Sequence, residues 1–123
     1  MNRVLIIEDK SDIRKLIRMT LGFENCEVHE ASDGASGLQA AIALRPDFVL
    51  LDIMMPGAIN GLEVCRTMKS MPELALVKIV FLTACGQLLD IEAGHMVGAD
   101  AYLIKPFSPL ELIATLQRLS APA

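Results

Sequence analysis

The chain has few aromatic residues and no tryptophan: one tyrosine and four phenylalanines occur among its 123 residues. It also lacks any cluster of lysines and arginines, and its formal net charge is −4. Domains that bind nucleic acid usually combine a basic surface with exposed rings on which bases stack. These absences argue against nucleic-acid binding by this segment.

Cysteines and long apolar runs are equally sparse. Cys26, Cys65 and Cys85 form no C-x-x-C pair and are odd in number, so we expect neither a disulfide framework nor a zinc site. The apolar runs have only the length of strands and end in charged or polar residues, so we expect no membrane span and no signal peptide. We therefore expect a cytoplasmic protein with no membrane contact, folded as a single domain over residues 1–123.

Four apolar runs have the composition of buried parallel strands, and polar residues follow each of them. The runs with these residues are Val4–Ile7 with Glu8 and Asp9, Phe48–Leu51 with Asp52, Ile79–Leu82 with Thr83, and Ala101–Ile104 with Lys105. A charged group that is buried without a partner costs several kcal/mol. We therefore expect these side chains to face one shared cleft.

Helical patterns lie between the strands. The predicted helices are Ile13–Leu21, Ala35–Leu44, Leu62–Ser70, Leu88–Met96 and Pro109–Leu119. Ser11 or Asp12 is expected to cap the first helix, whereas Ser108 and Glu111 form a capping box before the last one. The weak alternation of Cys26–His29 predicts an edge strand.

The resulting βαβαβαβαβα order predicts an α/β fold of the flavodoxin-like, doubly wound (βα)5 type. In this fold a parallel five-stranded sheet has the order 2-1-3-4-5 and helices cover both faces. The first and third strands are then adjacent. Glu8, Asp9 and Asp52 should consequently be neighbours.

Three carboxylates in one cleft predict a bound cation. Each pair at about 4 Å repels by roughly 4 kcal/mol at an effective dielectric constant of about 20. Lys105 supplies one positive charge, and Mg²⁺ suits the remaining oxygens while it keeps positions open for phosphate. A carboxylate beside a metal and a lysine can attack phosphorus, and the Thr83 hydroxyl can donate to a phosphoryl oxygen. The cluster therefore predicts a phosphoryl acceptor site.

These motifs resemble one known family. Glu8-Asp9, Asp52 within Leu-Leu-Asp-Ile-Met-Met-Pro, Thr83-Ala84 and Lys105-Pro-Phe have the order and spacing of receiver domains of two-component response regulators, including the single-domain chemotaxis type. The resemblance covers essentially the whole chain. It implies a phosphorylation-controlled signalling switch that receives its phosphoryl group from a histidine kinase or a histidine phosphotransfer protein.

The resemblance also implies roles for the acidic residues. Asp52 is expected to accept the phosphoryl group. Asp9 and Asp52 are expected to bind Mg²⁺ directly, with Glu8 acting through water and Met54 contributing its backbone carbonyl. Such a domain is not an enzyme with a separate substrate, since it catalyses only its own Mg²⁺-dependent phosphorylation and dephosphorylation.

Further roles follow for the last two strands. Lys105 is expected to pair with the phosphoryl group and to precede a cis peptide bond to Pro106, while Thr83 binds a phosphoryl oxygen. Tyr102 is expected to turn inward when Thr83 moves, which would change the surface of the fourth helix, the fifth strand and the fifth helix.

Two features depart from the family pattern. The loop Pro56–Gly61 is one residue longer than usual, and Cys85 occupies a position that often controls how water reaches the phosphoryl group.

Three other functions are alternatives to a phosphorylation-controlled switch. A phosphatase or dehalogenase on a similar sheet needs a second aspartate where Met54 stands, and a flavin-binding module would find its phosphate repelled by Glu8 and Asp9. A pseudo-receiver that is never phosphorylated would not need the full set of five residues Glu8, Asp9, Asp52, Thr83 and Lys105.

Overall fold

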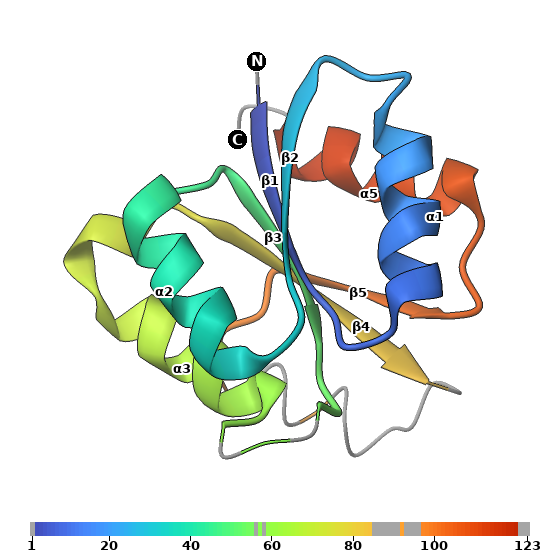
Figure 1. Cartoon of the computed structure of the whole chain (residues 1–123). Helices are drawn as coiled ribbons and strands as arrows, with labels where there is room; N and C mark the ends of the chain where they lie inside the picture. The colour runs from blue at the N-terminus through green and yellow to red at the C-terminus, as the bar shows by residue number, and fades with distance from the viewer. Residues whose placement is uncertain (1, 56, 58, 85–91, 93–96, 121–123) are drawn as a thin grey trace.

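The computed structural model contains a five-stranded parallel sheet with helices on both faces (Figure 1). It describes residues 2–55, 57, 59–84, 92 and 97–120. The elements are β1 (Asn2–Ile7), α1 (Ser11–Leu21), β2 (Cys26–Ala31), α2 (Gly34–Leu44), β3 (Phe48–Asp52), α3 (Gly61–Ser70), the 3-10 turn η1 (Pro72–Leu74), β4 (Lys78–Ala84), β5 (Ala101–Lys105) and α5 (Pro109–Ser120).

The strands have the order β2-β1-β3-β4-β5, and every neighbouring pair is parallel. The predicted flavodoxin-like order and the edge position of the second strand are thus confirmed. Ile7 of β1 pairs with Leu51 of β3, and Asp52 pairs with Leu82 of β4. The end of β3 therefore lies between the ends of β1 and β4.

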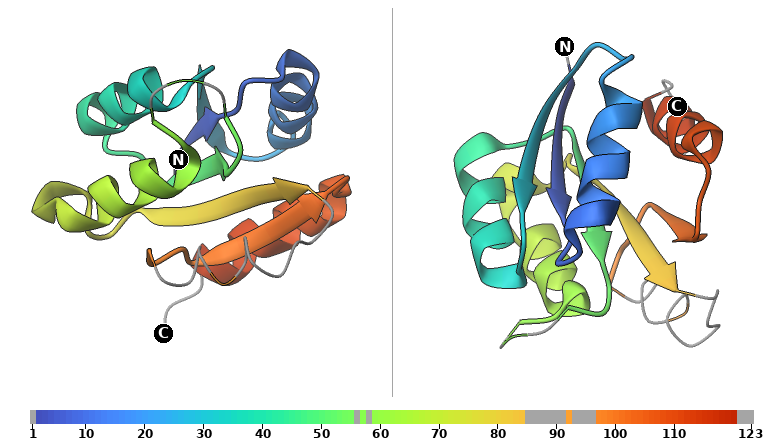
Figure 2. Two further views of the ribbon diagram at one scale, coloured as in Figure 1. Left: turned by 90° about the horizontal axis from the view of Figure 1, so that it is seen from below. Right: turned by 45° about the vertical axis from the view of Figure 1, so that its right-hand side comes forward.

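Two hydrophobic layers hold the helices to the sheet. One layer packs between the sheet and helices α2 and α3, and the other packs between the sheet and helices α1 and α5 (Figures 1 and 2). All five residues of β3 are buried, as expected for a central strand that is covered on both faces. The two layers fix β3 in place and with it the carboxylate at its end.

The predicted cap of α1 is wrong. The helix already begins at Ser11, and Lys10 precedes it without a side-chain cap. Among the described residues, Asp12 accepts a hydrogen bond only from the amide of its neighbour Ile13, at 3.0 Å. The amide of Lys10, the residue that precedes the helix, donates to Glu8 Oε2 at 3.3 Å, so a side chain outside the helix contacts this turn.

The other helix starts agree with sequence signals. Asp33 accepts from the Ser36 amide at 2.8 Å before α2, and Asn60 accepts from the Glu63 amide at 3.0 Å before α3. The capping box of α5 is confirmed. Its two hydrogen bonds run from the Glu111 amide to Ser108 Oγ at 3.1 Å and from the Ser108 amide to Glu111 Oε1 at 3.4 Å.

Several sequence predictions concern residues outside the described part of the chain. The predicted helix Leu88–Met96 lies there except for residue 92, and so do Pro56, Ala58 and Cys85. Cys26 and Cys65 have free thiols. Within the described residues, no helix combines the length and the apolar character needed to cross a membrane.

Candidate functional site

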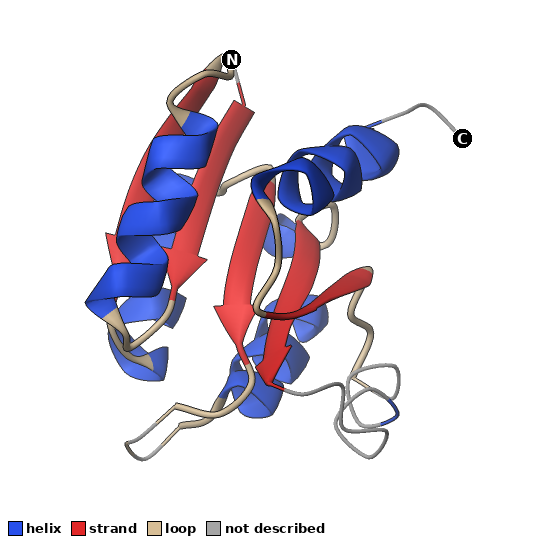
Figure 3. Cartoon of the chain, turned by 90° about the vertical axis from the view of Figure 1, so that its right-hand side faces the viewer, coloured by secondary structure: helices blue, strands red, loops and turns tan. Residues whose placement is uncertain are grey.

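The parallel strands deliver their polar end residues to one edge of the sheet. The arrowheads of β1, β3 and β4 point toward this edge (Figures 1 and 3). Because β1 and β3 are adjacent, Glu8 and Asp9 meet Asp52 there. One carboxylate oxygen from each of the three residues lies within 4.8 Å of the others. The predicted acidic cluster is confirmed.

The cluster is largely removed from solvent. Glu8 is completely buried, Asp52 is 4% exposed, and Asp9 is partly buried. The side chain of Lys105 reaches the cluster from the end of β5. Its Nζ lies 2.7 Å from Glu8 Oε1 and 3.4 Å from Asp52 Oδ1. One ammonium therefore partly balances three carboxylates, and the predicted cis bond between Lys105 and Pro106 is present.

This imbalance perturbs the acidity of the carboxyl groups. Burial, together with hydrogen bonding to Glu8 and its negative charge, raises the pKa of Asp52 from 3.8 to about 7, although Lys105 acts in the opposite direction. Burial also acts to raise the pKa of Asp9, but hydrogen bonds with Glu8 and Asp52 outweigh it and leave that pKa lowered. The metal-free cluster therefore retains a proton close to neutral pH.

The donor atoms fit a hard divalent cation. Oδ1 of Asp9 is buried and, among the described residues, accepts from no amide, hydroxyl or ammonium group, since its neighbours are the carboxyl groups of Glu8 and Asp52, so it is available as a ligand. The carboxylate oxygens of Glu8 and Asp52 complete a set of the kind that Mg²⁺ prefers. A dication would also remove the repulsion that makes Asp52 hold its proton. Both the chemistry and the electrostatics of the cluster suit magnesium.

Met54 contacts the cluster through its backbone. Its amide donates to Asp52 Oδ1 at 3.1 Å, while its side chain is 72% exposed. The amide thus helps to orient the Asp52 carboxylate. The predicted ligand role of the Met54 carbonyl stays a prediction.

Thr83 lies at the same edge of the sheet. It follows Leu82, the β4 residue that pairs with Asp52, and its side chain is 2% exposed. Its Oγ1 is buried without a hydrogen-bond partner in the described part of the chain. A buried hydroxyl without a partner is available to donate to a group bound beside Asp52.

Tyr102 lies on the same face of the sheet as Thr83. It pairs with Phe81, two residues before Thr83 on β4, and side chains two apart on a strand share a face. The rings of Phe81 and Tyr102 stack with centroids 6.5 Å apart and an interplanar angle of 19°. Burial raises the pKa of the Tyr102 hydroxyl. Thr83 and Tyr102 thus lie on one face of the sheet, and their role as a switch pair stays a prediction.

Gly61 is a site residue that the sequence indicated only as part of a helix boundary. A Cβ at this position would collide with the backbone carbonyl of Asp52, and the Gly61 amide donates to the Ile53 carbonyl at 3.1 Å. Only glycine lets the start of α3 approach the end of β3 this closely. The Asn60-Gly61 pair indicates a helix boundary in the sequence, but no sequence pattern indicates that this boundary packs against the end of β3.

Comparisons with known proteins agree with this geometry. The family model of the response regulator receiver domain matches residues 4–117. The transcriptional regulatory protein ResD of Bacillus subtilis is 37% identical over 117 residues, which are 95% of this chain and 47% of that protein. The DNA-binding response regulator MtrA of Mycobacterium tuberculosis is 38% identical over 115 residues, which are 94% of this chain and 49% of that protein. The chain thus spans about half the length of these curated relatives.

Solved structures extend the comparison to the whole fold. A putative response regulator from Chloroflexus aurantiacus superposes with a TM-score of 0.93 at 30% identity, with 98% of both chains covered. The chemotaxis response regulator CheY4 of Vibrio cholerae gives a TM-score of 0.90 at 33% identity, with 97% of this chain and 98% of that one covered. The family match covers most of the chain and includes the three residues of the acidic cluster. The chain therefore belongs to the receiver domains of response regulators.

Proposed function

We propose that Asp52 accepts a phosphoryl group and that the domain, spanning residues 1–123, acts as an Mg²⁺-dependent switch in two-component signalling. The observation that carries this proposal is the buried cluster of Glu8, Asp9 and Asp52 with Lys105 at its edge. The phosphoryl donor is a histidine kinase or a histidine phosphotransfer protein. Family membership supports this class of donor.

The transfer forms one bond and breaks one. An Asp52 carboxylate oxygen attacks phosphorus, the phosphorus–nitrogen bond to the donor's imidazole breaks, and the imidazole retains the electron pair and is protonated. A bound Mg²⁺ would neutralise charge on the phosphoryl oxygens. Asp9 and Asp52 would hold this ion directly, Glu8 through water, and Met54 through its carbonyl oxygen.

The remaining groups bind the transferred phosphoryl group. Lys105, already 3.4 Å from Asp52 Oδ1, pairs with one phosphoryl oxygen. The Thr83 hydroxyl, which has no hydrogen-bond partner among the described residues, donates to another. Movement of Thr83 then allows Tyr102 to turn inward, and this motion alters the surface of β5 and α5, and of the fourth helix that the sequence predicts.

The domain modifies only itself, and its output depends on partners. A phosphatase or dehalogenase would need a carboxylate at position 54, where the exposed Met54 side chain offers none. The names of some relatives include DNA binding, but this chain has a net charge of −4 and no basic cluster. We propose that it controls a partner or a linked domain and contacts no nucleic acid itself.

Phosphorylation by a small donor tests the proposal directly. The protein is incubated with acetyl phosphate or phosphoramidate and Mg²⁺, and intact mass spectrometry measures the gain of one phosphoryl group. The wild-type protein should gain it, whereas Asp52→Asn, or the wild type with excess chelator, should not. Asp12→Asn is the matched control, since Asp12 is an exposed acid on α1 outside the cluster. Phosphorylation that persists in Asp52→Asn would overturn the assignment.

A further inference from the structure

One arginine links the acidic cluster to the edge of the sheet. Nη1 of Arg14, on α1, donates to the backbone carbonyl of Glu8 at 2.7 Å. Nε of the same guanidinium donates to Glu30 Oε1 on β2 at 3.1 Å. We propose that Arg14 is a positioning residue that holds the Glu8–Asp9 turn in the geometry required for the cation. This inference rests on the proposed metal site and adds a residue to it.

The hydrogen-bonded carbonyl has a direct effect on a proposed ligand. The carbonyl of Glu8 belongs to the peptide plane that also contains the Asp9 amide, and such planes rotate as rigid units. Fixing this oxygen therefore fixes the backbone from which the Asp9 carboxylate extends. The contact is also a charge-assisted hydrogen bond, which is stronger than a bond between neutral groups.

Glu8 is held at three other points, and none of them replaces Arg14. Its amide donates to the Ala31 carbonyl at 3.1 Å, and its side chain contacts Lys105 at 2.7 Å and the Lys10 amide at 3.3 Å. These contacts fix the nitrogen and the side chain of Glu8. Only the Arg14 contact acts on its carbonyl among the hydrogen bonds of the described residues.

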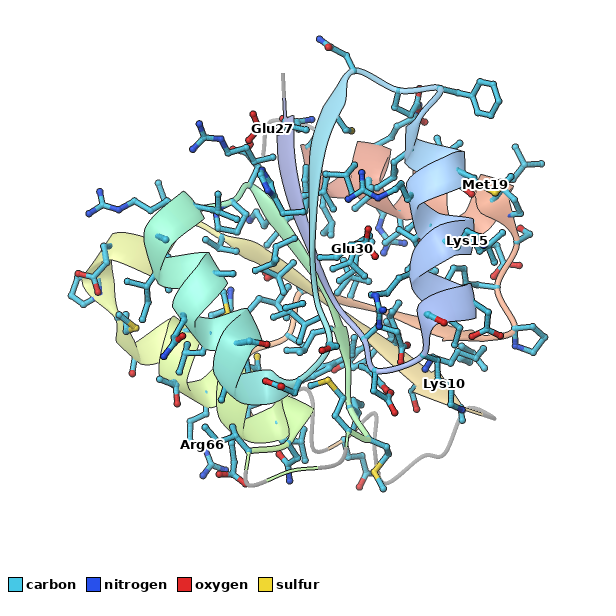
Figure 4. The ribbon with its side chains drawn as sticks, in the orientation of Figure 1. Lys10, Lys15, Met19, Glu27, Glu30 and Arg66 are labelled. Atoms are coloured by element: carbon cyan, nitrogen blue, oxygen red, sulfur yellow. The ribbon has the colours of Figure 1, made fainter. Side chains whose placement is uncertain are left out.

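Glu30 keeps the Arg14 guanidinium in place. Figure 4 shows Glu30 in the space between β2 and α1. Its second oxygen, Oε2, accepts from Nε of Arg18 at 2.6 Å, so two arginines on successive turns of α1 share one carboxylate. Arg18 also donates to the Val28 carbonyl at 3.2 Å. Glu30 thus offsets only one of the two positive charges, and the positioning role of Arg14 rests on its hydrogen bond to the Glu8 carbonyl.

The pair Arg14 and Arg18 provides a matched comparison. Both arginines bind Glu30 from α1, but only Arg14 contacts Glu8. Arg14→Met should weaken Mg²⁺ binding by about tenfold, the usual size for the loss of a group that orients a ligand, whereas Arg18→Met should change it by less than about twofold. Arg14→Lys, which keeps the charge but can form fewer hydrogen bonds, should give an intermediate loss.

The experiment measures Mg²⁺ dissociation constants by amide-shift titration, with urea unfolding of each variant to verify folding. In acetyl phosphate reactions, Arg14→Met should raise the Mg²⁺ concentration for half-maximal rate and leave the rate at saturating Mg²⁺ nearly unchanged. In the metal-free protein, the NMR order parameter of the Asp9 amide should fall in Arg14→Met and stay at its wild-type value in Arg18→Met.

The outcomes separate this inference from the proposed function. If the wild type binds Mg²⁺ but Arg14→Met and Arg18→Met have equal affinities for it, the positioning role is refuted and the metal site stands. A wild-type protein that binds no Mg²⁺ would overturn the proposed function and this inference together. An Arg14→Lys variant with wild-type affinity would refute the positioning role, because it would show that the charge of Arg14 alone is sufficient.

Discussion

Replacing the proposed phosphoacceptor should make the metal-free protein more stable at neutral pH. Asp52→Asn removes a carboxyl group that is 4% exposed and lies beside two other carboxylates. The neutral amide has nearly the same shape and its oxygen can still accept from the Met54 amide, the contact that Asp52 makes at 3.1 Å. The substitution therefore removes unfavourable charge while it preserves packing.

The magnitude follows from the pKa of Asp52, which rises from 3.8 to about 7 on folding. The folded protein binds this proton more tightly than the unfolded chain does, so the group favours folding when protonated and this contribution is lost as pH rises from about 4 to about 7. One pKa unit corresponds to about 1.4 kcal/mol, which sets an upper limit of about 4 kcal/mol. Asp52→Asn should recover much of this free energy above pH 7 and little of it below pH 4.

Urea unfolding followed by circular dichroism measures the effect, at acidic and at mildly alkaline pH with excess chelator. The stability gained by Asp52→Asn should increase with pH, and added Mg²⁺ should stabilise the wild type more than the variant. Asp12→Asn, which alters an exposed acid, should show neither effect. A variant that is less stable than the wild type at pH 8, or that gains the same stability at every pH, would refute the electrostatic reasoning.

Three further predictions concern the rest of the site. Mg²⁺ affinity, measured by calorimetry, should fall as pH drops below about 7, because the cation must displace the proton held by Asp52; equal affinities at pH 5 and pH 8 would contradict this. Lys105→Met should lower the free energy of unfolding of the metal-free protein, measured in urea, by about 3 kcal/mol, because completely buried Glu8 loses the ammonium 2.7 Å away. Added Mg²⁺ should reduce that loss of stability. Thr83→Ala should still accept phosphate but show small amide shifts at Tyr102 with a beryllofluoride mimic; shifts of wild-type size would place the coupling elsewhere.

Much of the fold was predictable because buried parallel strands are recognisable individually. The runs that end in Glu8-Asp9, Asp52 and Lys105 are apolar, of strand length and separated by helical patterns. Alternation of this kind limits the topology to a few possibilities, and the strand order then places the three carboxylates together. The acidic site followed from the same step, because parallel strands end at one edge of the sheet.

The details that were missed depend on contacts between distant segments. Arg14 and Glu30 are 16 residues apart and belong to different elements, so no periodicity relates them. Gly61 was interpreted only as a helix boundary, although it is required by the approach of α3 to Asp52. The predicted cap of α1 was wrong for a similar reason. The amide of Lys10, which precedes the helix, donates to Glu8 of the acidic cluster, and no side chain caps the helix at Lys10.

The charges at the site indicate how phosphorylation reaches the protein surface. With its three carboxylates ionised and Lys105 as the counter-ion, the cluster has two negative charges in excess, which one Mg²⁺ would neutralise. Conversion of the Asp52 carboxylate into an acyl phosphate replaces one negative charge by about two. The added charge requires a further donor, and the buried Thr83 hydroxyl has no hydrogen-bond partner among the described residues. Thr83 shares a sheet face with Tyr102. A movement of Thr83 toward the added charge would therefore change the side-chain packing of Tyr102 on β5.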